Sequence, residues 1–543
     1  MQNTKLGRIT GLSTRWFYVF LTIVIIFGSA LRCINIDSRV YWYDEIFTSF
    51  RIAGYRQSEV KQELIHKSTA TPSDLMVYQR PSSERSLAAT VQGLIAEEPQ
   101  HTPIYFVLAR LWTEQFKDFG STVLVIRSFS VFVSLLSFLC LYWLCLELFG
   151  SPSVGLIAVA MMAVSPFHFV YAQEARPPVL WIFVIMLSSA FLLRALRLNT
   201  KLSWIAYALS VVLNLYAFLF SVFVLASHGV YVVLMQGGRL TKTTIAYLIA
   251  TVVGLLAFLP WLLVIASNLG AVNNATGWSS VKIGSLNLLK MTLNNLRDVF
   301  FSFGQGYGYL TFLLLTLIAF SLYFLWRKAP KSVWIFVFSL IGVTVITLLV
   351  PDLIRGGESR STASRYFIAP YLGIHLSLAY LFYTQGSAAV RWSRNFWQAI
   401  TAFLLALGTA SCIAISQSEF SFNTTIYRHS ITLARAINKY EHPLIVTSTK
   451  YPNNIIAAIC LSYWLKPDTQ FRFVTDTHQD QSSERAKAIF VYGGDSELLL
   501  SSNHPKYQAK LIFDDLKNQY STSENLWYLE ERQGKQEAGA GQH

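Results

Sequence analysis

Long apolar runs separated by short polar segments occupy most of the first 416 residues of the chain. About 20 apolar residues in a helix are enough to cross the hydrocarbon core of a bilayer, which is roughly 30 Å thick. The stretch 203–236 is too long for one crossing even with tilt, so we divide it into two. The pattern therefore predicts about eleven transmembrane helices. They cover residues 17–36, 122–147, 153–172, 177–196, 203–219, 221–236, 244–266, 307–326, 332–350, 366–385 and 396–416.

Two polar regions interrupt this pattern. In the first, residues 37–120, the segment 103–118 has charged and apolar positions at helical spacing and is short for a crossing, which predicts an amphipathic helix at the membrane interface. The second, residues 417–543, mixes short apolar strands with a helix and predicts a small extracytoplasmic α/β domain. We expect residues 1–416 to form the transmembrane domain, with 37–120 as its first outer loop. The expected C-terminal elements are strands at 444–447, 471–474 and 488–492 and a helix at 453–465.

Composition agrees with a polytopic α-helical membrane protein. Only 14% of the residues are charged, against about 25% in soluble globular proteins. The formal net charge of +14 would suggest a nucleic-acid partner in a soluble protein. Here the basic residues lie between apolar runs, so we attribute the charge to membrane topology and expect the lipid bilayer as a partner and no nucleic acid.

The basic residues set an expected orientation. With the N-terminus in the cytoplasm, nearly every basic cluster falls on the cytoplasmic side, as the positive-inside rule requires. The first apolar run lacks a small-residue cleavage site, so we expect a retained helix and not a cleaved signal peptide. The expected setting is a bacterial inner membrane, with the candidate site and the C-terminus extracytoplasmic. The cytoplasmic basic residues are Lys5, Arg8, Arg15, Arg194, Arg197, Lys201, Arg239, Lys242, Arg327, Lys328, Lys331, Arg391 and Arg394.

Some arginines close to the ends of predicted spans fall on the expected outer side, against this charge bias. Binding of an anionic lipid head group or a pyrophosphate-like group would explain Arg176, Arg355, Arg360 and Arg365. A solvated loop explains Arg355 and Arg360 equally well, because they lie in a Gly/Ser-rich segment. Arg365 directly opens a helix beside Tyr366, so we expect its guanidinium group to be better fixed.

The first outer loop begins with Tyr41-Trp42-Tyr43-Asp44-Glu45. Two adjacent carboxylates beside aromatic side chains at a membrane edge are costly to place and suited to acid–base chemistry. We predict that Asp44 and Glu45 are catalytic. The alternative is that Asp44 only caps a short helix.

Further candidate binding residues lie in two outer segments. His101 precedes a predicted helix N-terminus, where an imidazole suits a phosphate group, although a single histidine is more often structural. Gln173, Glu174 and Arg176 lie between two apolar runs and could hold a phosphate or sugar hydroxyls. The alternative for Glu174 and Arg176 is a surface ion pair of little energetic value.

With these segments, residues 15–385 resemble the GT-C fold glycosyltransferases of families 39 and 83, which include protein O-mannosyltransferase-like and aminoarabinose transferase-like enzymes. Pro178 departs from the pattern, since relatives often carry an aromatic residue there. Four segments carry the resemblance: Tyr43-Asp44-Glu45; His101-Thr102-Pro103-Ile104-Tyr105 leading to Arg127-Ser128-Phe129-Ser130; Ser165-Pro166-Phe167 through Gln173-Glu174-Ala175-Arg176; and Arg365-Tyr366.

The resemblance implies an integral-membrane glycosyltransferase that uses a polyprenyl-phosphate-linked sugar. By analogy Asp44 is the general base that deprotonates an acceptor hydroxyl, and Glu45 supports it. Arg176, His101 and Arg365 are candidates to stabilise the departing phosphate. The acceptor could be a protein, a lipid or a polysaccharide.

Two questions stay open at this point. A divalent metal is a possible cofactor, but two adjacent carboxylates are a thin ligand set. A lipid or glycan transporter or flippase is the alternative function class. It predicts charged residues deep within the spans and inverted repeats, and the sequence shows neither.

Overall fold

The computed structural model describes residues 12–304, 308–424, 426–450, 452–475, 488–493, 507–513 and 524–531. Lys5 and Arg8, which contribute to the expected orientation, lie outside the described residues. The chain divides into two compact units. The helical unit comprises Met1–Ile36, Leu94–Trp112 and Leu124–Ser418, and the sheet unit comprises Asp37–Gly93, Thr113–Val123 and Glu419–His543.

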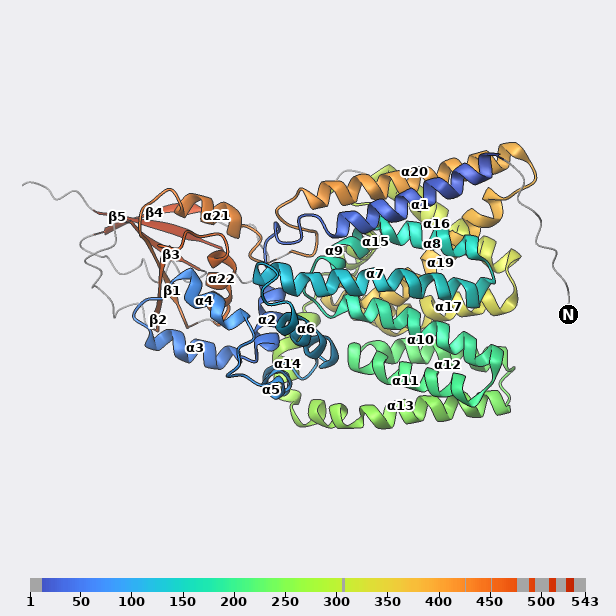
Figure 1. The fold of residues 1–543 in the computed structure, drawn as a ribbon, viewed down its shortest axis with the longest axis horizontal. Helices are drawn as coiled ribbons and strands as arrows, with labels where there is room; N and C mark the ends of the chain where they lie inside the picture. Colours follow the sequence, from blue (N-terminus) through green and yellow to red (C-terminus); the bar gives the residue numbers. More distant parts are fainter. Residues whose placement is uncertain are drawn as a thin grey trace, which may run out of the picture. The chain divides into compact units, whose positions relative to one another are not determined.

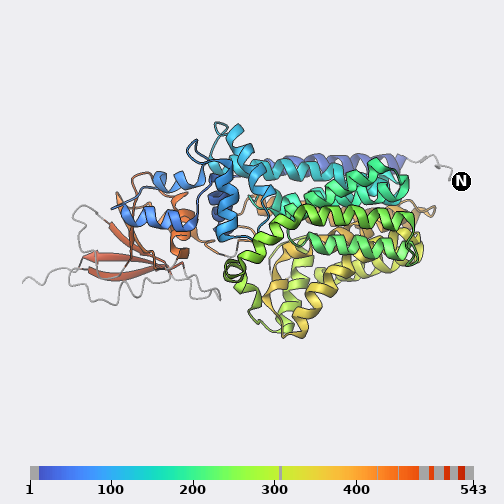
Figure 2. The ribbon, with the colours of Figure 1, turned by 90° about the horizontal axis from the view of Figure 1, so that it is seen from below.

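The helical unit is a bundle of long apolar helices that run side by side (Figures 1 and 2). In the described part of the chain, eight helices are long and apolar enough to cross a membrane. A ninth crossing is possible if α8 (Pro152–Ala163) and α9 (Pro166–Ala172), which are bent by 67° at their junction, form one broken span. The eight are Arg15–Arg32 in α1 (Leu12–Arg32), α7 (Thr122–Phe149), α10 (Pro178–Leu198), α13 (Lys242–Ser267), α16 (Gly308–Lys328), the segment Lys331–Ile354, the segment Ser364–Gly386, and α20 (Arg391–Ser416).

Two of these spans are composite helices. Lys331–Ile354 contains α17 (Lys331–Thr344), a π-helical turn (Val345–Leu349) and α18 (Val350–Ile354). Ser364–Gly386 contains the short 3₁₀ helix η5 (Ser364–Phe367) and α19 (Ile368–Gly386). Before them, the segment between α13 and α16 forms α14 (Leu269–Thr276), η2 (Gly277–Ser280) and α15 (Ser285–Asp298).

The two halves of the stretch 203–236 form the shorter helices α11 (Lys201–Ala217) and α12 (Ser221–Met235). At 1.5 Å per residue they are roughly 25 and 22 Å long, less than the hydrocarbon core. Buried hydrogen bonds join them to their neighbours: the ring nitrogens of His228 lie 3.2 Å from the hydroxyls of Ser189 and Tyr207. Every predicted apolar run is therefore helical, while the count of eleven crossings stays a prediction. Together α11 and α12 add either two crossings or none. Whether they cross therefore does not change the side of the membrane that the C-terminus faces.

The segment expected as an interfacial helix forms α6 (Ile104–Gln115), which at 12 residues is too short to span. Its burial differs from the simple pattern, because Arg110 is 1% exposed while Leu108 and Leu111 are 37% and 47% exposed. Spacing alone placed Arg110 on the polar face. Which face of a short helix is covered depends on neighbours that the local pattern does not contain.

The sheet unit contains five strands in the order β2-β1-β3-β5-β4. β1 pairs in parallel with β2 and β3, whereas β5 is antiparallel to both β3 and β4. The three expected strands and the small C-terminal α/β domain are confirmed, and β4 and β5 are additional. The strands are β1 (Pro443–Ser448), β2 (Gln470–Val474), β3 (Ala488–Tyr492), β4 (Tyr507–Phe513) and β5 (Leu526–Glu531).

Helices from the N-terminal and the C-terminal parts of the chain belong to the same unit as this sheet (Figure 1). Ala70 forms an antiparallel bridge with Phe471 of β2, and α2 packs against α22. Much of the first loop, expected as part of the transmembrane domain, thus belongs to the same compact unit as the C-terminal strands. The division into a transmembrane glycosyltransferase domain (1–416) and a C-terminal domain (417–543) stays a prediction. The helices are α2 (Tyr43–Ala53), α3 (Gln57–His66), α4 (Pro72–Met76), α21 (Ser430–Ile437) and α22 (Pro452–Ser462), with α5 (Leu87–Glu97) at the boundary of the two units.

Candidate functional site

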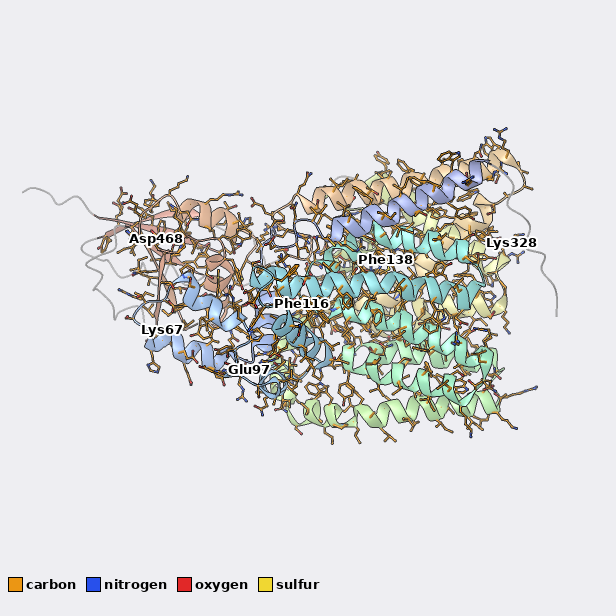
Figure 3. The ribbon with its side chains drawn as sticks, in the orientation of Figure 1. Lys67, Glu97, Phe116, Phe138, Lys328 and Asp468 are labelled. Atoms are coloured by element: carbon orange, nitrogen blue, oxygen red, sulfur yellow. The ribbon has the colours of Figure 1, made fainter. Side chains whose placement is uncertain are left out.

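The break between α8 and α9 is held by a buried arginine from α1. Arg32 is fully buried, and its guanidinium group donates hydrogen bonds to the carbonyls of Ala163 and, at 2.9 Å, Met162. The last carbonyls of a helix have no partner within the helix, so Arg32 satisfies the end of α8. Its Nε donates to Ser134 at 3.2 Å, and its guanidinium lies 4.9 Å from the centroid of the Phe138 ring, a residue labelled in Figure 3.

Gln173 makes the reciprocal contact. Its side-chain nitrogen donates to the carbonyls of Leu31, Arg32 and Ile34 at 3.3, 3.1 and 2.8 Å, and the residue is fully buried. These carbonyls close the end of α1, so the amide nitrogen of Gln173 has a structural role. Sugar binding by Gln173 stays a prediction.

Glu174 and Arg176 lie in the tight turn that joins α9 to α10. They are 3% and 7% exposed, so the alternative of a solvated surface pair does not describe them. The backbone amide of Arg176 donates to the carbonyl of Glu174 at 2.8 Å, and two prolines follow before the helix continues. The turn therefore fixes a buried guanidinium group at the end of an apolar helix.

The structure brings this turn close to the segment that begins α19. The hydroxyls of Tyr171 in α9 and Ser364 in η5 lie 3.4 Å apart. Ser364 is followed directly by Arg365 and Tyr366, the other predicted binding residues. Two candidate regions almost 200 residues apart in the chain thus share one end of the helical unit.

Arg365 and Tyr366 belong to an aromatic cluster. The Arg365 guanidinium lies 5.8 Å from the centroid of the Trp278 ring and 5.3 Å from that of Tyr366, within the range of a cation–π interaction. The Tyr366 ring packs edge-on against Phe220 at 4.3 Å. Phe218 stacks on Trp181 of α10 at 4.5 Å and also faces Tyr366.

Sequence reasoning missed Trp278, Phe218 and Phe220. A usable signal was present, since each lies outside a long apolar run or at its end, where an aromatic side chain combines an apolar face with access to the interface. What the sequence could not show is that three separate turns meet around Tyr366.

The other two outer arginines pair with carboxylates of their own loop. Arg360 forms an ion pair with Asp352, which is fully buried and also accepts a hydrogen bond from Ser361. Arg355 lies 3.6 Å from Glu358, with its side chain 59% exposed. The exposed Arg355 fits the alternative of a solvated loop, whereas Arg360 pairs with a buried carboxylate and so has a structural contact that the sequence did not suggest.

Asp298 is a buried carboxyl that sequence reasoning also missed. It is 7% exposed and forms a 2.8 Å ion pair with Arg297 at the end of α15. Burial raises the pKa of Asp298, and the neighbouring Arg297 charge opposes that shift only in part. The carbonyl of the next residue, Val299, accepts a hydrogen bond from the hydroxyl of Ser165, which lies at the break between α8 and α9. A carboxyl of perturbed pKa in this place is a candidate functional group, with a structural ion pair as the alternative.

His101 lies just before α6, as predicted. Its Nε2 is 3.8 Å from a carboxylate oxygen of Glu98, and its ring faces Phe106 at 6.1 Å. Trp261 of α13 donates to the carbonyl of Pro99 at 3.2 Å and anchors this segment within the helical unit. A phosphate-binding role for His101 stays a prediction.

Asp44 and Glu45 lie in the sheet unit, in the first turn of α2. The N-cap of this helix is Trp42, so the alternative that Asp44 is the cap does not match the structure. Carboxylates in a first helical turn are favoured by the helix dipole. Asp44 is partly exposed, whereas Glu45 is fully buried and lies close enough to Cys460 of α22 to add to the rise in the pKa of that thiol, which burial mainly causes.

Among the residues that the structure describes, no group of three or more His, Cys, Asp or Glu side chains is arranged to hold a metal ion. The divalent metal stays a prediction.

Similarity to known proteins bears on this arrangement. A family model described as dolichyl-phosphate-mannose-protein mannosyltransferase matches residues 100–264. The crystal structure of ArnT from Cupriavidus metallidurans bound to undecaprenyl phosphate matches with a TM-score of 0.50 and 12% identity, covering 95% of this chain and 98% of that chain. ArnT from the same organism in the apo state gives a TM-score of 0.49 at the same identity and coverage. No curated protein sequence matches the chain.

The shared architecture defines the fold class. The chain has the GT-C fold, and it is a multi-pass membrane protein. The predicted fold, a helical membrane domain with a small C-terminal α/β domain, is confirmed.

Proposed function

We propose that the protein transfers a sugar from a polyprenyl-phosphate-linked donor to an acceptor hydroxyl. The acceptor oxygen attacks the anomeric carbon as Asp44 takes the hydroxyl proton. The bond from that carbon to the phosphate oxygen breaks, and the polyprenyl phosphate leaves with the electron pair. One displacement of this kind inverts the anomeric centre.

The observation that carries the proposal is the arrangement around the α9–α10 turn. Arg176 and Arg365 lie at one end of a bundle of apolar helices, and aromatic rings surround Arg365. A lipid phosphate needs cations at a membrane edge, and a sugar or an isoprenoid chain packs well on aromatic faces. The match to ArnT, whose crystal structure contains undecaprenyl phosphate, supports this donor class.

Within this proposal the predicted residues have separate tasks. Arg176, Arg365 and His101 stabilise the leaving phosphate, and Tyr366, Glu174 and Gln173 bind the donor head group. Asp44 is the base, with Glu45 in a supporting role. The acceptor is a protein, a lipid or a polysaccharide.

We further propose that the reaction takes place on the extracytoplasmic face of a bacterial inner membrane. Glu147 at the end of α7 pairs with Arg194 at 3.5 Å and Arg197 at 2.8 Å near the end of α10, so these helix ends share one face. Arg176 precedes the opposite end of α10. The positive-inside rule assigns the Arg194–Arg197 end to the cytoplasm, and thus the candidate donor site to the outer face.

The test is sugar transfer in membranes that contain the protein and radiolabelled polyprenyl-phosphate sugars, with label counted in protein, lipid and polymer fractions. Asp44→Asn should lower the rate by roughly 10²-fold or more, because general bases contribute about 10²–10⁴-fold. Asp37→Asn is the matched control, since Asp37 is an exposed carboxylate of the same loop. Removal of divalent cations with EDTA, followed by Mg²⁺, decides whether a metal assists.

Equal transfer by wild type and Asp44→Asn would remove Asp44 from the chemistry. No transfer from any polyprenyl-phosphate sugar, by a folded wild-type protein, would contradict the enzyme and favour the transporter or flippase alternative.

A further inference from the structure

The C-terminal part of the sheet unit contacts residues on both sides of Asp44. We propose that this domain holds residues 40–45 in the conformation that catalysis requires, and that Asn453 is a positioning residue for Asp44. The inference rests on the proposed role of Asp44, and it gives the C-terminal domain a function that its own sequence does not suggest.

The contacts begin on the backbone side of the stretch. The amide of Val40 donates to the carbonyl of Glu419 at 2.9 Å. Val40 and Trp42 form a buried cluster with Ile431 of α21, and Trp464 packs against it. This cluster fixes the chain just before α2 begins.

The aromatic residues on either side of Trp42 are held by different partners. The Tyr41 ring packs edge-on against Tyr463 at 5.2 Å, just beyond the end of α22. The Tyr43 ring lies 4.9 Å from Phe47 and 6.1 Å from Tyr427. Tyr41 and Tyr43 therefore each contact a tyrosine more than 350 positions later in the chain.

One polar contact ties the residue before Asp44 to the C-terminal domain. The Tyr43 hydroxyl donates to the side-chain oxygen of Asn453 at 3.2 Å, at the start of α22. The Tyr427 hydroxyl donates to the backbone carbonyl of Asn453 at 2.9 Å, which fixes the acceptor itself. Tyr427 has a φ of 58°, in the left-handed region that non-glycine residues rarely adopt.

The residue after Asp44 is fixed as well. Glu45 is fully buried, and α2 packs against α22 near Cys460. Asp44 thus lies between two residues that the C-terminal domain immobilises, while its own side chain is partly exposed. That is the arrangement expected of a reactive group on a rigid support, because a displacement of about 1 Å can cost roughly 10²-fold in rate.

The test compares kcat and donor KM of the full-length protein with Asn453→Leu, Asn453→Asp, Tyr43→Phe and the double variant Tyr43→Phe/Asn453→Leu. Asn453→Leu should lower kcat about fivefold, equivalent to about 1 kcal/mol. Asn453→Asp keeps an acceptor for Tyr43 and should restore kcat. The double variant should be no slower than the slower single variant, because both remove the same contact. Donor KM should change less than about twofold, since the candidate donor residues belong to the helical unit.

Tyr440→Phe is the matched control. Its ring packs on Phe490 and Tyr528 of the same sheet, so it removes a tyrosine hydroxyl from this domain at another place. All rates are normalised to folded protein, measured by size-exclusion chromatography and melting temperature. Tyr43→Phe retains the ring and gives a readout even if Asn453→Leu fails to fold.

Wild-type kcat in both Tyr43→Phe and Asn453→Leu would overturn the positioning role, and so would additive losses in the double variant. The failure of the proposed function has a different signature, because there Asp44→Asn itself would retain transfer.

Discussion

The two polar atoms of the Gln173 side chain allow a structural role and a binding role to be tested separately. Its amide nitrogen serves three carbonyls at the end of α1. Replacement by leucine removes this donor from the carbonyl of the fully buried Arg32, at a cost of about 1–3 kcal/mol. Replacement by glutamate directs acceptor oxygens at the same carbonyls. An ionised glutamate buries a charge against carbonyl oxygens, and a protonated one has a single O–H donor, so at pH 8 we expect a greater cost than for leucine, on the order of several kcal/mol.

The assay is the apparent melting temperature in detergent, followed by size-exclusion chromatography, together with transfer activity per folded protein. The expected order of stability is wild type, then Gln173→Leu, then Gln173→Glu. Donor binding, which we propose for Gln173, would use the side-chain oxygen and is tested separately by activity, because glutamate keeps an acceptor for a sugar hydroxyl and leucine does not. A stable, active Gln173→Glu beside a stable, inactive Gln173→Leu would refute the structural role.

Three further outcomes follow from the described contacts. Burial raises the pKa of the Asp298 carboxyl group. The stability that the protonated carboxyl contributes is therefore present below the ordinary Asp pKa of about 4 and is lost as the pH rises through the raised pKa. In thermal unfolding from pH 4 to 8, wild type should lose stability relative to Asp298→Asn. A Cβ atom at Gly28 would lie 2.4 Å from the carbonyl oxygen of Ala163, so Gly28→Ala should cost about 1–3 kcal/mol, whereas Gly342→Ala, which meets open space, should not destabilise. Trp278→Leu removes the ring beside Arg365 and should raise donor KM severalfold with kcat retained, and unchanged donor KM would exclude the aromatic cluster from donor binding.

Hydropathy located the long apolar helices of the bundle, because apolar length is a property of the local sequence, but not the short helices α14 and α15. Whether α11 and α12 cross the membrane cannot be predicted from their own sequence, because both are shorter than the hydrocarbon core. Hydrogen bonds to neighbouring helices, such as that between His228 and Tyr207, also stabilise them. The first three strands were visible as apolar runs. β4 was not, because it is an edge strand with most side chains exposed or half-exposed, and so lacks a continuous apolar signature.

The sequence allowed candidate site residues to be proposed one by one, but not their arrangement in space. The types and positions of Asp44, Arg176 and Arg365 pointed to acid–base chemistry and phosphate binding. The sequence could not reveal that the nitrogen of Gln173 is committed to α1, that Arg360 is neutralised by Asp352, or that Tyr43 reaches Asn453. Each depends on a partner that only tertiary folding brings within hydrogen-bond distance.

The exchange of contacts between α1 and the α8–α9 break has a consequence for biogenesis. Arg32 and the last carbonyls of α1 find their partners 102 to 142 residues later in the chain, so α1 leaves the ribosome before any of them. Insertion of α1 and its final packing are therefore separate events in time. Until the polypeptide has grown beyond Ala163, the guanidinium group lacks the carbonyls at the end of α8 and needs hydration at the membrane surface, and until it has grown beyond Gln173 the last carbonyls of α1 lack their amide donor.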